Sequence, residues 1–355
     1  MNKQTHTKFN LNNFLMAFSS ALDNTVPNNI NNVKFSSKAF AYIALTLANK
    51  LNVNKEFKSD IFSYCIINKN EIFMNNLDYI PFNQKSFLDD THSSISINIA
   101  AYIISNIKLQ DNTIINEIEL KNTIASNETI SDDVKEAFEQ ISNSESFWYD
   151  IMSNQLGFLL FEMLDDFTIE INFDDLIQFT AIVHDSIYSY INRSYEDNCI
   201  DFKAYAMANL FEFEPKDKAR FIIASHLINI GYLFMPLNIV NKPDILHHSE
   251  YQILKQVPYY TNYVLQQVYG FNDIAKLCYC TYETIDSNGY PNKLDGSRLS
   301  LKQRILNVLN IYQALCEKRS YRNKFNNDES FSILEDYSKH NKIDGTIVNS
   351  LKSII

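Results

Sequence analysis

The stretch TYETIDSNGYPNKLDGSRLS, residues 281–300, carries the most informative pattern in this chain. It contains Gly289 and Gly296, two of only six glycines among 355 residues. Glycine permits tight turns and close backbone approach, whereas proline fixes its own φ. Because Tyr290 and Pro291 follow Gly289 directly, the pattern predicts a stiff loop that presents a tyrosine.

Outside this loop, the distribution of apolar residues indicates helices. Glycine and proline are scarce, and apolar side chains recur at helical spacing, as over residues 8–24 and 37–53. Ser131 has the character of a helix N-cap, because acidic residues follow it in the first turn. The sequence therefore predicts an all-α protein.

A weak internal repeat indicates that the chain has two related halves. Residues 41–53 align without gaps with residues 201–213, so that Ala44 matches Ala204 at an offset of 160 residues. Self-similarity of this kind is typical of a duplicated helical unit. We therefore expect two helical bundles in tandem.

Charge and cysteine content exclude several classes of protein. The net charge is −11 and no stripe of lysine or arginine is present, so nucleic acid is not an expected partner. The five cysteines are odd in number and are expected to be reduced, which indicates a cytoplasmic protein. The uncharged segment 221–240 contains His226 and Asn229, whose polar side chains would be costly to bury in lipid. We predict a buried helix and a turn there, and no membrane insertion.

The motifs of residues 229–322 resemble those of the HD-GYP family, cyclic dinucleotide phosphodiesterases built from a helical metal-binding bundle. The matching pieces follow the family's order: NIG (229–231), NKP (241–243), IA (274–275), E..D..GYP (Glu283, Asp286, 289–291), RIL (304–306), AL (314–315) and RSYR (319–322). The resemblance implies an HD-GYP-like domain over 166–355, a connecting helix or linker over 131–165, and a diverged HD-like domain over 1–130.

The family's metal ligands are mostly replaced in this chain. By resemblance, the implied ligand positions are Glu196, Ile228, Asn229, Val257, Thr281, Tyr282 and Asn310. Histidine and carboxylate are the side chains that hold catalytic ions in such centres, and only Glu196 qualifies. In the first half, the histidine–aspartate dyad that gives the family its name maps to Asn68 and Lys69. The sequence therefore predicts a degenerate site without catalytic residues, metal or other cofactor, and a protein that is not an enzyme.

Four histidines could be mistaken for metal ligands and are not expected to bind an ion. By resemblance, the family's histidine–aspartate dyad maps to Ile228 and Asn229. His226 lies two residues before the first of these, roughly 200° around a helix, so it should face away from the metal centre. His184 lies in the segment before the upstream ligand, and His247 and His248 are expected to be exposed near a helix start.

In the family, the GYP loop lies at the mouth of the active site and takes part in substrate binding and in contacts with cyclase domains. By resemblance, Gly289, Tyr290 and Pro291 are candidates for protein interaction. Tyr290, Arg319, Tyr321 and Arg322 are candidates for ligand binding, since arginine suits phosphate and tyrosine can stack on a purine. The alternative is that these residues only hold the loop to the bundle.

Three functions are compatible with these features. The main interpretation is a scaffold or regulator in bacterial cyclic dinucleotide signalling, whose partner is another signalling protein such as a cyclase domain. The first alternative is a receptor that binds cyclic di-GMP or a related cyclic dinucleotide without cleaving it. The second is a metal-dependent phosphodiesterase with a non-standard site around Glu196, His226, Glu283 and Asn310.

Overall fold

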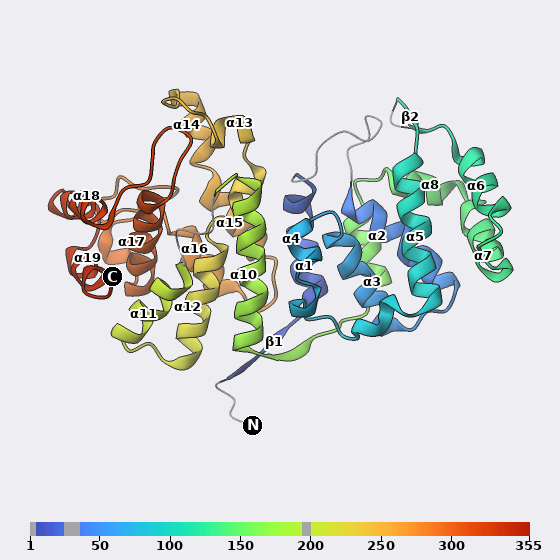
Figure 1. Cartoon of the computed structure of the whole chain (residues 1–355), viewed down its shortest axis with the longest axis horizontal. Coiled ribbons are helices and arrows are strands. Elements are labelled where there is room, and N and C mark those ends of the chain that lie inside the picture. The colour runs from blue at the N-terminus through green and yellow to red at the C-terminus, as the bar shows by residue number, and fades with distance from the viewer. Residues whose placement is uncertain (1–4, 25–35, 112, 194–199) are drawn as a thin grey trace. The chain divides into compact units, whose positions relative to one another are not determined.

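A computed structural model describes residues 5–24, 36–111, 113–193 and 200–355 (Figure 1). Apart from two short strand pairs, the described residues form helices and turns, which confirms the predicted all-α class. The contacts divide the chain into an N-terminal unit, Asn10–Ile169, and a C-terminal unit, Met1–Phe9 with Glu170–Ile355. No helix among the described residues has both the length and the apolar character needed to span a bilayer.

The N-terminal unit is built around α2, whose alanine-rich faces are buried against α3, α5 and α9. Its helices are α1 (Leu11–Asp23), α2 (Ser37–Lys50), α3 (Lys55–Ile67), α4 (Glu71–Met74), α5 (Thr91–Asn106), α6 (Glu117–Ser126), α7 (Asp132–Ser142), α8 (Glu145–Ile151) and α9 (Leu156–Met163). Strands β2 (Leu109–Gln110) and β3 (Thr113–Ile114) form a short hairpin. Residues 131–165, expected as a connection, thus form α7, α8 and α9 of this unit, with Ser131 at the predicted N-cap position.

The C-terminal unit is a second helical bundle, in which α10 packs against α12 and α11 against both α12 and α17 (Figure 1). Its helices are α10 (Phe173–Tyr190), α11 (Ile200–Leu210), α12 (Pro215–Leu227), α13 (Leu237–Val240), α14 (His248–Leu254), α15 (Val257–Leu265), α16 (Asn272–Tyr279), α17 (Leu301–Cys316), α18 (Asn327–Lys339) and α19 (Gly345–Lys352). Strand β1 (His6–Phe9) pairs with β4 (Ile169–Asn172). The uncharged segment 221–240 begins as the buried end of α12, as predicted, and continues through a 3₁₀ helix (Ile230–Phe234) into α13.

The helix pairs α2–α3 and α11–α12 have the same local construction. The second helix of each pair begins and ends at the offset of 160 residues, since α3 spans Lys55–Ile67 and α12 spans Pro215–Leu227. The connecting turns match as well, because Asn52 has a φ of 55° and Glu212 a φ of 51°. Both residues therefore adopt the left-handed conformation that ends a helix without glycine.

A side-chain hydrogen bond recurs at the same offset. Lys58 Nζ donates to Asn49 Oδ1 over 2.7 Å, and Lys218 Nζ donates to Asn209 Oδ1 over 2.9 Å. In each pair the bond ties the first turn of the second helix to the end of the first helix. This agreement supports a duplicated helix pair, whereas a full HD-like domain in the first half stays a prediction.

Candidate functional site

A cavity of about 490 Å³ lies within the C-terminal unit, a volume usual for small-molecule sites. It is enclosed by the end of α10, the turn after α12, the 281–290 loop and the C-terminal end of α17. Tyrosines dominate its walls: Tyr188, Tyr232, Tyr251, Tyr282, Tyr290, Tyr321 and Tyr337. The cavity therefore offers aromatic surface together with phenol groups that can form hydrogen bonds.

Residues predicted separately from the sequence come together around this cavity. All four candidate ligand-binding residues, Tyr290, Arg319, Tyr321 and Arg322, line it. So do four positions implied as metal ligands, Asn229, Thr281, Tyr282 and Asn310. Of the other implied positions, Ile228 and Val257 are buried apolar residues and Glu196 lies outside the described part of the chain.

The loop behind Tyr290 is held by a buried carboxylate. Glu283 accepts hydrogen bonds from the backbone N–H of Asn292 over 2.6 Å and of Leu294 over 2.9 Å. On the other side, Asn307 Nδ2 donates to the carbonyls of Thr281 and Glu283, over 2.8 and 2.9 Å. The Glu283 carboxylate is thus engaged by its own loop, and its role is to fix the loop's shape.

Gly289 allows the loop to fold back on itself. A Cβ at this position would lie 2.3 Å from the backbone nitrogen of Thr284, a distance that no side chain can occupy. The close approach places the Tyr290 ring against the Tyr282 ring, with 5.2 Å between the centroids and 23° between the planes. Of the candidate interaction residues Gly289, Tyr290 and Pro291, Tyr290 alone is among the described residues that line the cavity.

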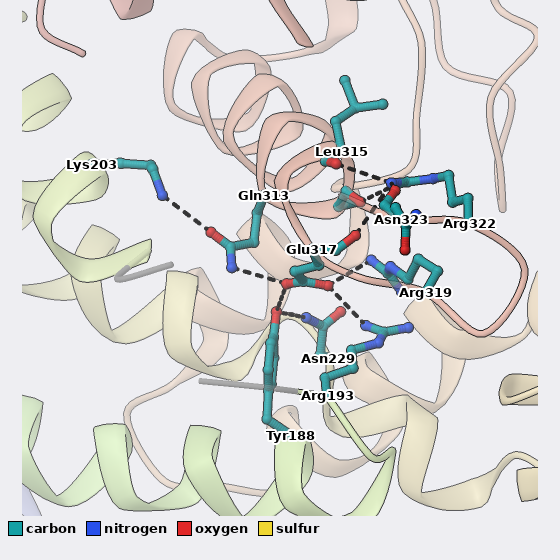
Figure 2. Close-up of polar contacts among 11 residues, drawn as sticks. Tyr188, Arg193, Lys203, Asn229, Gln313, Leu315, Glu317, Arg319, Arg322 and Asn323 are labelled. Carbon is teal, nitrogen blue, oxygen red and sulfur yellow. Dashed lines mark hydrogen bonds and ion pairs between the residues drawn. The ribbon is translucent and has the colours of Figure 1, made fainter. Parts of the chain in front are cut away.

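Two arginines and one glutamate form the charged centre of the cavity (Figure 2). Arg319 Nη2 lies 2.8 Å from Glu317 Oε2, and Arg193 Nη1 lies 3.9 Å from the same oxygen. The Glu317 side chain is only 2% exposed. Burial opposes its ionisation, but Arg319 and Arg193 outweigh that effect and hold the pKa of Glu317 below its usual value. The carboxylate is therefore charged.

Neutral groups complete this centre. Glu317 Oε1 accepts hydrogen bonds from the Tyr188 hydroxyl and from Gln313 Nε2, each over 2.9 Å. Asn229 Nδ2 donates to the Tyr188 hydroxyl over 3.4 Å. Asn229 Oδ1 and Arg319 Nε are buried without a hydrogen-bond partner. Buried polar atoms are normally paired, so this centre has donor and acceptor capacity to spare.

Arg193 also contacts the tyrosine wall. Its guanidinium lies 4.8 Å from the centroid of the Tyr232 ring, a cation–π distance. Burial disfavours the Tyr232 phenolate, yet Arg193 and Arg319 outweigh it and lower the pKa of Tyr232. The hydrogen-bonded neighbour Tyr282 is affected in the opposite direction, since burial and Tyr232 raise its pKa. Tyr282 is therefore a phenol donor at neutral pH.

Arg322 has a different environment from Arg319. Its Nη1 donates to the carbonyls of Leu315, Glu317 and Asn323, over 3.0, 3.2 and 3.0 Å, and its Nη2 donates to the carbonyl of Ala314. These carbonyls include the last ones of α17, which carry partial negative charge. Arg322 thus closes the C-terminal end of α17 from within the cavity wall.

Sequence reasoning missed Arg193, Glu317 and Tyr188. The only available signal was compositional, because every arginine of the chain lies between residues 193 and 322. Arg193 follows α10 and Glu317 follows α17, so only the packing of the bundle brings them to one place.

The four histidines discussed above have the burial that the sequence predicted for them. His226 is fully buried, with its two ring nitrogens 2.9 Å from Thr180 Oγ1 and 2.6 Å from Asp201 Oδ1. His184 is buried and stacks on Tyr188 at 4.1 Å between centroids. His247 and His248 are exposed at the start of α14.

The cavity does not fit the metal cluster that the family resemblance implies. Among the described residues, no three histidine, cysteine, aspartate or glutamate side chains are grouped so that they could hold an ion. Glu317, the one carboxylate that the described part of the chain contributes to the cavity lining, is already paired with two guanidinium groups. The amide of Asn310 and the hydroxyl of Thr281 are weak substitutes for imidazole and carboxylate. This donor set favours an anion over a cation.

Comparison with known proteins finds similarity within the C-terminal unit. Residues 183–347 match the family model for the HD domain. Two Vibrio cholerae proteins, 3′3′-cGAMP-specific phosphodiesterases 1 and 3, are 29% and 30% identical over 119 and 132 residues. These matches cover 34% and 37% of this chain, and 28% of each relative. Cyclic di-GMP phosphodiesterase PdeB of Borreliella burgdorferi is 27% identical over 131 residues, 36% of this chain and 34% of the relative.

A solved structure agrees with the fold along nearly the whole chain. The crystal structure of the cyclic GMP-AMP-specific phosphodiesterase V-cGAP3 of V. cholerae aligns with a TM-score of 0.52, covering 98% of both chains at 13% identity. At that identity the agreement concerns the fold alone.

These relatives contradict one prediction from the sequence, that the protein is not an enzyme. Relatives that match about a third of this chain are named as phosphodiesterases of cyclic dinucleotides. The prediction assumed that a chain without the implied metal ligands has no activity. The similarity of this chain to enzymes contradicts that assumption. The family match and the relatives together support an HD domain of the HD-GYP type in residues 183–347 of this chain.

Proposed function

We propose that this protein binds a cyclic dinucleotide in the tyrosine-lined cavity of its C-terminal unit. The observation that carries the proposal is the pair of buried arginines, Arg193 and Arg319, which share one carboxylate within aromatic walls. The names of the relatives support the same class of ligand. The net charge of the chain is −11, so the rest of its surface repels nucleotides. A cluster of arginines that favours anions stands in contrast to that surface.

Arg193 and Arg319 are suited to hold a phosphodiester. A guanidinium presents a planar fork of donors that matches two phosphate oxygens, and it keeps its charge when buried. Arg319 Nε is buried without a partner, so one donor of this fork is available. Arg322 supports the site from behind, because its donors are engaged by carbonyls of the chain.

The tyrosines are suited to hold the bases. The Tyr290 ring is fixed by stacking on Tyr282, and Tyr321 at the cavity's edge is 58% exposed. Stacking of a base on an aromatic ring contributes about 1–3 kcal/mol without selecting a particular base. We therefore assign Tyr290 and Tyr321 to base contacts and the arginines to phosphate contacts.

Cleavage of the bound phosphodiester is a second candidate function, and the names of the relatives support it. The groups that this cavity offers to a phosphodiester are guanidinium and phenol. They could bind and orient the ligand, and the buried Tyr282 phenol could donate a hydrogen bond to a phosphate oxygen. Cleavage of the nucleotide can be measured on the same mixtures of protein and nucleotide that are used to measure binding.

The predicted contact with another signalling protein through Gly289, Tyr290 and Pro291 stays a prediction. Gly289 is buried and the other two residues are only half-exposed. A protein that uses this loop as a docking surface would have to contact its exposed neighbours, such as Asn288 and Lys293.

Calorimetric titration with cyclic di-GMP and with 3′3′-cGAMP tests the proposal. We expect one ligand per chain, and Arg193→Gln should weaken binding by at least about tenfold, because it removes a charge-assisted contact. Arg298→Gln is the matched control, since Arg298 is exposed and does not line the cavity. Chromatography of the same mixtures, with and without added Mn²⁺, detects cleavage. Wild-type protein that binds neither nucleotide, or Arg193→Gln protein that binds like wild type, would overturn the proposal.

A further inference from the structure

The charged residues that line the cavity are few enough for their charges to be compared. Among the described residues they are Arg193, Glu317, Arg319 and Arg322. Arg322 directs its guanidinium at backbone carbonyls at the end of α17, whose partial negative charge offsets it. The other two arginines face the same carboxylate oxygen of Glu317 (Figure 2).

Among the described side chains that line the cavity, this centre of Arg193, Arg319 and Glu317 has one positive charge in excess. Lys203 lies outside the lining, with its Nζ 3.4 Å from Gln313 Oε1. Two guanidinium groups remain charged when buried, and the lowered pKa of Glu317 keeps its carboxylate ionised. A buried charge without compensation is costly, so a site of this kind favours a ligand that supplies a single negative charge. A phosphodiester carries one negative charge, whereas a phosphomonoester carries about 1.5 to 2 at pH 7.

We propose that Glu317 is a specificity-determining residue, which sets the cavity to accept the phosphodiester of a cyclic dinucleotide and to reject a phosphomonoester. The inference rests on the proposed function and adds the reason for its selectivity. Arg193 and Arg319 attract the phosphate, and the Glu317 carboxylate between them leaves room for only one further negative charge. Hydrolysis of a cyclic dinucleotide adds water across one P–O bond and turns one phosphodiester into a terminal phosphomonoester. Such a linear product would therefore bind less well than the ring.

Glu317→Gln tests the proposal because it removes the charge and keeps the shape. Dissociation constants are measured at pH 7.5 for cyclic di-GMP and for linear 5′-pGpG, which ends in a phosphomonoester. We expect wild-type protein to prefer the cyclic ligand by at least about tenfold. In Glu317→Gln, the affinity for the linear ligand should rise on the order of tenfold, and that for the cyclic ligand should change less.

Two further variants control the experiment. Gln313→Glu is made together with Lys203→Gln, because Lys203 Nζ lies 3.4 Å from Gln313 Oε1 and would neutralise the new charge. The added carboxylate beside Glu317 Oε1 should weaken the linear ligand more than the cyclic one. Glu214→Gln makes the same chemical change as Glu317→Gln at an exposed residue outside the cavity, and it should alter neither constant. Circular dichroism establishes that each variant is folded. If Glu317→Gln does not fold, Gln313→Glu still decides the question.

Each outcome has a distinct meaning. A preference that Glu317→Gln and Gln313→Glu leave unchanged within about threefold would overturn this inference and leave the proposed function standing. Equal losses for both ligands in folded Glu317→Gln would also overturn it, because Glu317 would then only position the arginines. Wild-type protein that binds neither ligand would overturn the proposed function, and this inference with it.

Discussion

Glu317 and Arg319 form a buried ion pair at the point where the chain leaves α17, with 2.8 Å between Oε2 and Nη2. The pair is joined by Arg193 from the end of α10 and by the hydroxyl of Tyr188. Because the carboxylate is only 2% exposed, solvent cannot replace a partner that is lost. The same pair therefore affects both the stability of the bundle and the charge of the cavity.

Glu317→Ala should destabilise the C-terminal unit by about 3–5 kcal/mol, because it leaves two buried guanidinium groups without their carboxylate. Hydrogen exchange of peptides covering residues 301–325 measures the local free energy of opening. Glu335→Ala is the control, since the pair of Glu335 with Lys352 is 40% and 53% exposed and should be worth about 1 kcal/mol or less. Similar effects of the two substitutions would contradict the importance of the buried pair.

Gly289→Ala should displace the loop and abolish cyclic dinucleotide binding. The new Cβ would meet backbone atoms at 2.3 and 2.5 Å, which cannot move aside as a flexible side chain could. Gly157→Ala is the control, because a Cβ there meets nothing within 4 Å and alanine favours a helix by about 1 kcal/mol. Titration and thermal unfolding of both variants provide the comparison, and a Gly289→Ala protein with normal binding would refute the role of this close approach.

Glu283→Gln should loosen the loop of residues 284–296. The amide would present a donor to one of the two backbone N–H groups that the carboxylate accepts, at a cost of about 1–3 kcal/mol. Exchange of the loop amides should accelerate by roughly tenfold or more, and exposed Glu212→Gln should leave it unchanged. Unaltered exchange in Glu283→Gln would mean that the loop is held by other contacts.

The N-terminal unit should lose stability as the pH rises from about 4 to about 7. Burial raises the pKa of Asp60 to about 6, against its opposing hydrogen bonds from Gln84 and Asn83, whereas the unfolded chain has the ordinary value of 3.8. The folded state therefore binds more protons in this window, and ionisation above pH 6 costs it roughly 3 kcal/mol. Fluorescence of Trp148, the only tryptophan, follows unfolding. Asp60→Asn should flatten the profile, and an identical profile would contradict the assignment.

Binding of a cyclic dinucleotide should survive removal of divalent cations. The groups that we assign to the phosphate are the guanidinium groups of Arg193 and Arg319, which need no ion to attract an anion. Titrations after dialysis against EDTA should give the dissociation constant of the untreated protein within about twofold. Loss of binding on chelation, restored by Mn²⁺, would show that an ion holds the phosphate instead.

Local features of the chain were predictable because their causes lie close together in sequence. Helical spacing predicted α1 and α2, and Ser131 was placed correctly before α7. The order of short motifs around Gly289 and Tyr290 led to the HD-GYP resemblance, which the family match and the relatives support. The replacement of the implied metal ligands was also evident from the sequence. The conclusion that activity is absent was wrong, because a list of missing ligands does not describe the site that replaces them.

The amino-acid sequence thus determined the helical class and the loop, since backbone propensity and turn chemistry act over a few residues. Tertiary structure alone decided the charge of the cavity, because Arg193 and Glu317 become neighbours only when α10 and α17 pack in one bundle. It also separated Arg319, which faces Glu317, from Arg322, whose donors end at backbone carbonyls. This difference matters because water is excluded from the protein interior, so that the nearest partner dominates the electrostatic interactions of each guanidinium group.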